Sequence, residues 1–227
     1  MSGRDEIGPE SGPGDLLGEP VLAGPAPRGL GRHMAGGGDK VDRRGNDYYP
    51  TPPEVTRALL RVELNAIDRA LAATCGPVWE PCGRGGAILR ELRAAGWPVV
   101  GSDIVPDPPH GVTQMDLLKA TQALGRVVVT NPPFALAADM ISVLLERLKV
   151  PYLALLLKSQ FWHADERRAL FRRHTPARIW ALTWRPDFLG GGAPTMDCIW
   201  VVWDASHAGP TRFDVLPRAA EAQGELL

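Results

Sequence analysis

From Asp47 onward the chain alternates short apolar runs with longer segments of helical periodicity, and this alternation is what most limits the folds open to it. Runs such as Val127-Val128-Val129 are apolar at every position, which is typical of strands buried on both faces of a parallel sheet. The expected strands are 77–80, 99–104, 126–130, 152–158, 177–183 and 197–203, and the expected helices are 53–73, 87–95, 137–148 and 164–174. The sequence therefore predicts an α/β fold with helices on both faces of a mostly parallel sheet. The last two strands have no helix between them, so we expect them to form an antiparallel hairpin at the sheet edge.

The composition of the chain changes near residue 47. Residues 1–46 contain 12 Gly, 5 Pro and no aromatic residue, whereas all 3 Tyr, 7 Trp and 5 Phe come later. Because so little apolar surface can offset the entropy lost on ordering, we predict that 1–46 is a disordered tail. The end of the chain, 205–227, is expected to be loosely ordered, which leaves 47–204 as the domain. The sequence leaves open whether Met34 is the true start.

The charge balance and the cysteines exclude several classes of protein. The 25 Lys+Arg oppose 26 Asp+Glu, and this net charge of -1 argues against a protein that coats nucleic acid by bulk electrostatics. No apolar run reaches the ~20 residues of a transmembrane helix and no secretory signal opens the sequence, so we expect a cytoplasmic protein without a membrane partner. Cys75, Cys82 and Cys198 have neither the number nor the spacing of a disulfide framework or a zinc site, so we expect reduced thiols and no metal.

A glycine-rich turn follows the strand expected at 77–80 and reads Glu80-Pro81-Cys82-Gly83-Arg84-Gly85-Gly86. In an open α/β sheet, ligands bind beyond the carboxyl ends of the strands, where glycine lets the backbone approach them. The turn lacks the GxGxxG spacing of a dinucleotide site, and Glu80 suits a cation better than a phosphate. Asp103 ends the next strand, where its carboxylate can accept hydrogen bonds from ribose hydroxyls, and Asp116 adds a third carboxylate. The three acids predict a site for a positively charged nucleoside.

The strand expected at 126–130 leads into Asn131-Pro132-Pro133-Phe134. Two consecutive prolines hold this loop extended and leave backbone carbonyls without local donors. The Asn131 side-chain oxygen and the Pro132 carbonyl can accept the two N–H groups of an exocyclic amine, which favours the tetrahedral nitrogen that attacks carbon. Phe134 can stack on a planar substrate. The loop holds no cysteine nucleophile, and its neutral acceptors suit an amino group.

These motifs resemble those of the class I S-adenosylmethionine-dependent methyltransferases. The loop Asn131–Phe134 is similar to the (Asn/Asp/Ser)-Pro-Pro-(Tyr/Phe/Trp) motif of amino-group enzymes, in particular N6-adenine-specific DNA methyltransferases. The resemblance covers about 47–204, and it implies a Rossmann-like domain with a seven-stranded sheet, S-adenosylmethionine as the cofactor and DNA as the partner. The catalytic residues it implies are Asn131, Pro132, Pro133 and Phe134. The cofactor-binding residues it implies are Tyr49, Thr51, Glu80, Pro81, Gly83, Gly85, Asp103, Ile104, Asp116 and Asn131.

The resemblance also implies a role for each part of the cofactor site. The turn after Glu80 would pass the methionine part, Asp103 would bind the ribose, and Asp116 would bind the adenine amino group. Thr51 would bind the methionine carboxylate. Thr51 is also a natural N-cap for the helix expected from residue 53, and the two roles are compatible.

The stretch 158–185 carries seven basic and two acidic residues, a local net charge of +5 that can contact phosphates. The substrate-binding residues we expect are Lys158, Phe161, Trp162 and Arg185. Alternatively, the arginines form a solvated basic face. Phe161 and Trp162 can equally pack against the core.

The leading hypothesis is an enzyme that methylates N6 of adenine in DNA. The same Asn-Pro-Pro chemistry serves methylation of RNA adenine or of a protein glutamine amide, and a non-catalytic module that keeps the fold is a further alternative. Only one helix is expected between the Asn131–Phe134 loop and Tyr152, which leaves no room for a large target-recognition insert, so stringent sequence selectivity is not expected.

Overall fold

The computed structural model describes residues 49–218. The tail predicted at 1–46 lies outside these residues, as does the end of the chain from residue 219.

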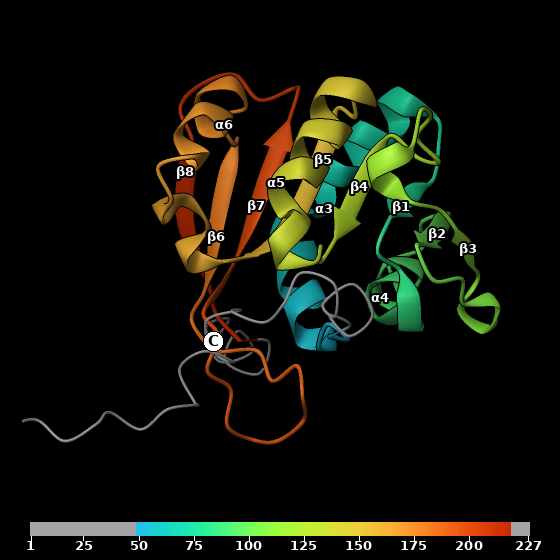
Figure 1. Ribbon diagram of the computed structural model, residues 1–227, viewed down its shortest axis with the longest axis horizontal. Helices are drawn as coiled ribbons and strands as arrows, with labels where there is room; N and C mark the ends of the chain where they lie inside the picture. Colours follow the sequence, from blue (N-terminus) through green and yellow to red (C-terminus); the bar gives the residue numbers. More distant parts are fainter. Residues whose placement is uncertain (1–48, 219–227) are drawn as a thin grey trace, which may run out of the picture. The chain divides into compact units, whose positions relative to one another are not determined.

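The described residues form one eight-stranded sheet with the strand order β3-β2-β1-β4-β5-β7-β6-β8 (Figure 1). Its strands are β1 (Val78–Glu80), β2 (Val99–Asp103), β3 (Val112–Gln114), β4 (Val127–Thr130), β5 (Tyr152–Lys158), β6 (Arg178–Leu182), β7 (Cys198–Asp204) and β8 (Arg212–Leu216). The strands from β3 to β5 are parallel, β7 runs antiparallel to both β5 and β6, and β8 runs parallel to β6. The predicted α/β class and the antiparallel pairing of β6 with β7 are confirmed.

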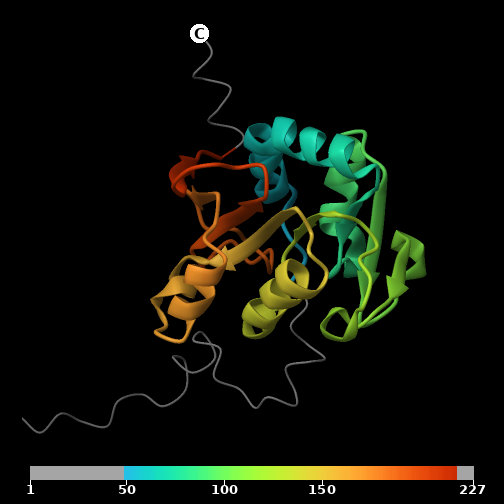
Figure 2. The same cartoon turned by 90° about the horizontal axis from the view of Figure 1, so that it is seen from above.

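Helices cover both faces of this sheet (Figure 2). The helices are α3 (Pro53–Thr74), α4 (Ala87–Ala94), α5 (Ala137–Ser142) with a π-helical turn (Val143–Arg147) that extends it, and α6 (Arg167–Arg173). On one face, Leu59 of α3 and Ile88 of α4 are buried in a core cluster with Trp200 of β7. On the other face, Ile141 of α5 and Leu170 of α6 are buried in a second cluster. The central strands β4, β5 and β7 therefore contribute apolar side chains to both cores, which explains why their sequences are almost continuously apolar.

The sheet has eight strands rather than the expected seven, and the prediction that the chain is loosely ordered from residue 205 is wrong for β8. This strand pairs with β6 along its whole length and occupies the sheet edge where the β6–β7 hairpin was expected. The physical reason is that β8 is a short edge strand, which has no continuous apolar run like those of the central strands. Leu216 is buried, whereas Phe213 and Val215 are exposed.

A buried polar network joins α3 to the strands beneath it. The Glu63 side chain has no exposed surface and accepts hydrogen bonds from the Tyr152 hydroxyl (2.9 Å) and from Trp180 Nε1 (2.7 Å). It also accepts two from Arg178, through Nε (2.6 Å) and Nη2 (2.9 Å), and Arg178 Nη2 reaches Asp204 Oδ2 at 2.8 Å. Burial, together with the neighbouring Glu63 charge, raises the pKa of Tyr152 well above its ordinary value, so its hydroxyl remains a donor. The network fixes α3, and with it the segment just before α3, against the sheet.

The parallel strands place their following loops at one edge of the sheet. The carboxyl ends of β1, β2 and β4 carry Glu80, Asp103 and Asn131 respectively, and β4 points downward to this edge in Figure 1. Because β6 runs in the same direction as β5, the connection 183–197 between β6 and β7 begins and ends at this edge too. The three motifs found in the sequence therefore meet at the edge where ligands bind in such sheets.

Candidate active site

The glycine turn links β1 to α4 through a short 3₁₀ turn, Arg84–Gly86. Gly85 has φ +74° and Gly86 has φ +63°, both in the left-handed region that favours glycine. The Gly83 amide donates to the Ser102 carbonyl at 2.9 Å, which ties the turn to β2. Pro81 and Gly83 are buried beneath the turn, whereas Gly85 is partly exposed. The backbone is thus fixed in a conformation that few other residues could adopt.

Glu80 is the buried acid of this turn. Its side chain is 3% exposed, and among the described residues its Oε2 atom has no hydrogen-bond partner. Burial raises the pKa of the Glu80 carboxyl well above its ordinary range, and the neighbouring Asp103 charge adds to the increase. A buried carboxylate oxygen without a donor is costly unless a ligand supplies one, so this atom suits an ammonium group or another cationic group.

Asp103 ends β2 and faces the glycine turn. Its Oδ1 atom accepts a hydrogen bond from the Val105 amide at 3.0 Å, and its Oδ2 atom accepts one from the Arg84 amide at 3.4 Å. The side chain is partly exposed, so both oxygens retain room for a second donor. Ile104, directly after Asp103, is 53% exposed and offers an apolar surface beside the carboxylate.

The Asn131-Pro132-Pro133-Phe134 loop leaves β4 and enters a 3₁₀ turn at Phe134–Leu136. Asn131 Nδ2 donates to Thr51 Oγ1 at 3.1 Å. The other end of the same amide, Asn131 Oδ1, is buried and has no hydrogen-bond partner among the described residues. The structure therefore presents an unused acceptor at the position where the sequence predicts one.

Thr51 is buried beside Asn131, although it lies 80 residues away in the chain. The suggestion that Thr51 caps α3 is wrong, since the N-cap is Pro52 and no side chain caps the helix. The reason is that Pro53 occupies the first helical position, which shifts the cap by one residue, and the Thr51 hydroxyl instead accepts from Asn131. Tyr49 is 37% exposed at the start of the described segment.

Asp116 follows β3 and holds its own loop together. Its Oδ1 atom accepts from the Leu118 amide at 3.1 Å, and Lys119 Nζ lies 3.1 Å from Oδ2. Asp116 and Met115 line a hollow of about 350 Å³ that extends to Leu124. The expected third acid therefore borders a cavity, but both of its oxygens already have donors.

The four residues expected to bind substrate lie in three different surroundings. Lys158 ends β5 and places Nζ 4.9 Å from the centre of the Phe134 ring, so it joins the Asn131–Phe134 loop. Phe161 and Trp162 pack edge to face with each other, and Trp162 packs in the same way on Phe171 and Trp203. These contacts fit the packing interpretation of Trp162.

Arg185 lies in the connection 183–197, where its Nε atom donates to Asp197 Oδ1 at 2.8 Å on the surface. The Ser159 amide donates to the Asp197 carbonyl at 3.0 Å, so the connection is tied to the segment that follows Lys158. Arg185 is therefore held at the same edge of the sheet as the candidate site.

Sequence reasoning missed Asp107, whose Oδ2 atom accepts a hydrogen bond from the Gly85 amide at 2.8 Å. The contact joins residues 22 apart, and its only sequence signal is the turn-forming run of Pro108, Pro109 and Gly111 that follows it.

The cysteine of the glycine turn takes no part in this chemistry. Burial raises the pKa of the Cys82 thiol far above its ordinary value, so the thiol stays protonated and is a poor nucleophile. This agrees with the interpretation of Cys82 as a small packed side chain.

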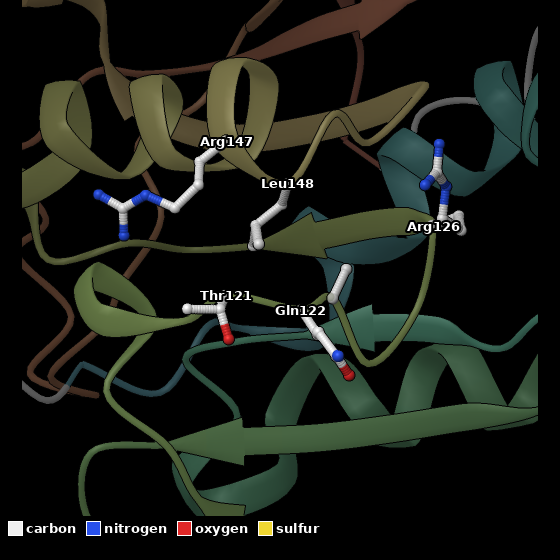
Figure 3. Close-up of a pocket in the computed structure, with 6 residues that line it drawn as sticks. Thr121, Gln122, Arg126, Arg147 and Leu148 are labelled. Atoms are coloured by element: carbon white, nitrogen blue, oxygen red, sulfur yellow. The ribbon is translucent and has the colours of Figure 1, made fainter.

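A second cavity of about 280 Å³ shares Thr121, Gln122 and Ala123 with the hollow beside Asp116 and extends past β4 between Arg126 and Arg147 (Figure 3). It is lined by Thr121, Gln122, Ala123, Arg126, Arg147 and Leu148. Arg147 Nη1 donates to the Leu118 carbonyl at 2.8 Å, and Arg126 Nη2 donates to the Lys149 carbonyl at 2.9 Å. Arg147 therefore ties the end of the α5 extension to the loop after Asp116, and Arg126 ties the start of β4 to the segment before β5.

The described range, residues 49–218, holds neither a membrane-spanning helix nor a metal-binding cluster. No helix there is long and apolar enough to cross a membrane. No group of three or more His, Cys, Asp or Glu side chains in that range is arranged to hold a metal ion.

Solved structures with the same fold include methyltransferases and restriction-modification proteins. One, from Listeria monocytogenes, is assigned to the class I S-adenosylmethionine-dependent methyltransferases; it has a TM-score of 0.52 and 12% identity over 82% of this chain and 69% of that chain. The type IIG restriction endonuclease BpuSI gives a TM-score of 0.56 and 14% identity over 74% of this chain and 27% of its own. A modification subunit assigned to a type I restriction enzyme of Vibrio vulnificus YJ016 gives a TM-score of 0.50 and 15% identity over 78% of this chain and 49% of its own.

These similarities establish the Rossmann-like fold of the class I methyltransferases for this chain. The chain spans about a quarter of BpuSI and about half of the Vibrio subunit. No protein-family model matches the sequence, and no curated protein matches it either.

Proposed function

We propose that this protein binds S-adenosylmethionine and transfers its methyl group to the N6 amino group of adenine in DNA. The observation that carries the proposal is Asn131 Oδ1, which is buried, lacks a hydrogen-bond partner among the described residues and belongs to a proline-locked loop at the ligand edge of the sheet. A buried acceptor without a donor is destabilising in the free protein, and an N–H group of the substrate would satisfy it.

The cofactor fits the neighbouring residues. The Glu80 carboxylate has an unused buried oxygen that suits a cationic group, Asp103 presents a partly exposed carboxylate that suits ribose hydroxyls, and the exposed Ile104 suits a planar base. When bound, S-adenosylmethionine supplies a methyl group activated by its sulfonium sulfur. The residues of this chain then have to hold and orient the two reactants.

The Asn131–Phe134 loop would orient the amino group. Thr51 fixes the amide nitrogen of Asn131, so the carbonyl oxygen of the same side chain stays directed to the substrate. Asn131 Oδ1 and the Pro132 carbonyl would accept the two N–H groups, and Phe134 would stack on the base. No base stronger than these neutral acceptors is needed in the site, because the nitrogen releases its proton to solvent once it has been methylated.

Nucleic acid is favoured as the substrate by the charges next to this loop. Lys158 lies over Phe134, and Arg185 is held at the same edge of the sheet by Asp197. Such groups contact phosphates in a sequence-independent way. DNA is favoured over RNA by the likeness of the fold to a restriction endonuclease and to a modification subunit.

Radiolabel transfer tests the proposal. Purified protein is incubated with tritiated S-adenosylmethionine and, in parallel, with duplex DNA, total RNA or a protein extract. The labelled polymer is then digested, and mass spectrometry identifies the modified unit. We expect N6-methyladenosine with a deoxyribose sugar. Label in ribonucleosides or in glutamine would move the proposal to the corresponding substrate, and cofactor binding without any labelled product would refute enzymatic activity.

Asn131→Ala removes the acceptor that carries the proposal. We expect this variant to lose about 10²-fold or more of the transfer rate while it still binds the cofactor, because only the substrate orientation is lost. Asn65→Ala, which alters an exposed asparagine on α3, is the matched control and should retain full activity. An active Asn131→Ala variant would contradict the assigned role of this residue.

A further inference from the structure

Asp107 belongs to no motif recognised in the sequence, yet it contacts the centre of the proposed cofactor site. Its Oδ2 atom accepts the Gly85 amide at 2.8 Å, next to the Arg84 amide that donates to Asp103 Oδ2 at 3.4 Å. Two carboxylates, Asp103 at the end of β2 and Asp107 four residues later, therefore hold two successive amides of the glycine turn. Asp107 makes the shorter of these two contacts.

Asp107 is itself held firmly. Its backbone amide donates to the Val112 carbonyl and its carbonyl accepts from the Val112 amide, both at 3.0 Å. The residues between them form a tight 3₁₀ turn, Pro108–His110, closed by Gly111 at φ +74°. Asp107 therefore stands at the base of a closed loop that starts directly after β2 and returns as β3.

His110 adds a second contact between this loop and the glycine turn. Its Nδ1 atom lies 2.7 Å from Asp107 Oδ2, the same oxygen that accepts from Gly85. The ring also fills the space beside Gly86, where an added Cβ atom would lie 2.9 Å from it. The loop thus packs against two consecutive glycines that both have positive φ.

We propose that Asp107 is a positioning residue for the cofactor: by holding the Gly85 amide, it fixes the glycine turn in its binding conformation before the cofactor arrives. The inference rests on the proposed cofactor. An unrestrained glycine-rich turn has high backbone entropy, and a ligand that has to order it loses affinity. Binding to a turn that is already ordered avoids this entropic cost. The hydrogen bond from Gly85 also lowers the pKa of the Asp107 carboxyl, with a further contribution from His110, so the acceptor stays charged at neutral pH.

Two substitutions distinguish positioning from general stability. Asp107→Ala removes the acceptor, and we expect the dissociation constant for S-adenosylmethionine, measured by calorimetry well below the melting temperature, to rise on the order of tenfold. Asp107→Asn retains one oxygen that can accept from both Gly85 and His110, so it should bind within about threefold of wild type. Turnover at saturating cofactor should stay nearly unchanged in both variants, so that KM rises and kcat does not.

The matched control is Asp214→Ala, which removes an acid on the edge strand β8 that pairs with Arg212 at 2.8 Å. It should leave cofactor affinity unchanged. An Asp107→Ala variant that binds the cofactor as wild type does would overturn the inference, even if it melted at a lower temperature.

Amide hydrogen exchange at Gly85, followed by NMR in the free protein, separates this inference from the proposed function. We expect Gly85 to exchange slowly in wild type and faster in Asp107→Ala. If wild type binds no S-adenosylmethionine, the proposed cofactor is wrong and the positioning role falls with it, while slow exchange would still show that Asp107 holds the turn. Rapid exchange in wild type would overturn the inference without any variant, including the case in which Asp107→Ala does not fold.

Discussion

Glu63→Ala is expected to be among the most destabilising single substitutions in the domain. The side chain has no exposed surface and accepts four hydrogen bonds, from Tyr152, Trp180 and twice from Arg178. Removing one partner of a buried ion pair costs about 3–5 kcal/mol, because the remaining charge stays buried. Two neutral donors would also lose their acceptor, at about 1–3 kcal/mol each.

Two features of the network reduce this total. Arg178 keeps its bond to Asp204 at 2.8 Å, and its side chain is 13% exposed, so water can reach part of it. We therefore expect a loss near 4 kcal/mol, at the middle of the range for one buried partner. For a domain of this size about 2–4 °C accompanies each kcal/mol, so the melting temperature should fall by about 8–16 °C.

Urea denaturation followed by circular dichroism measures the change in the free energy of unfolding. Glu63→Gln keeps one acceptor oxygen and should lose about half as much as Glu63→Ala. Glu54→Gln on the same helix breaks only a 3.4 Å surface contact with Arg218 and should stay within about 1 kcal/mol of wild type. A Glu63→Ala variant within 1 kcal/mol of wild type at an unchanged m-value, against the ~3–5 kcal/mol expected, would refute the reasoning.

Two further predictions concern pH dependence and backbone packing. Because burial raises the pKa of Glu80, the carboxyl of the free protein stays protonated at pH values where an ordinary glutamate is ionised. Cofactor affinity measured by calorimetry should therefore increase with pH. Glu80→Gln should weaken binding, abolish the pH dependence and stabilise the free protein at neutral pH. Gly125→Ala would push a Cβ atom into the Pro77 carbonyl and to 2.9 Å from Trp79 Cβ, so it should lose about 1–3 kcal/mol or more in denaturation, whereas Gly191→Ala meets nothing within 4 Å and should be neutral. Equal stability of the two alanine variants, or binding by wild type that does not vary with pH, would count against these arguments.

The sequence predicts the main elements because their burial follows regular periods. The helix expected at 53–73 is α3 at Pro53–Thr74, and the strand expected at 152–158 is β5 with identical bounds. It misses β3 because that strand has three residues, of which only Val112 is buried. It misses β8 although residues 212–215 alternate polar and apolar side chains, because this five-residue segment follows a Gly-Pro turn near the end of the chain, and the alternating side chains Phe213 and Val215 are exposed rather than part of the core.

The sequence predicts those residues of the candidate site that stand at the ends of strands. It does not predict the contacts that join residues distant in the chain. Glu80, Asp103 and Asn131 each follow a strand in the sequence, so the fold class alone brings them to one edge. The partner of Asn131, Thr51, could be placed near the site but not paired, since 80 residues separate the two. Asp107 could not be found at all, because its importance depends on one hydrogen bond between two loops.

Because β7 runs antiparallel to its neighbours, the connection that precedes it can vary in length. The connection 183–197 has both of its anchor points at the ligand edge, so its length can vary without moving any strand or the glycine turn. Each doubling of a flexible loop adds only about 0.6 kcal/mol of closure entropy, so even a long insertion there is tolerated. Under the proposed function, segments grafted at Gly190–Gly192, where an added Cβ atom meets nothing within 4 Å, would change the choice of target and leave the Asn131–Phe134 loop unaltered.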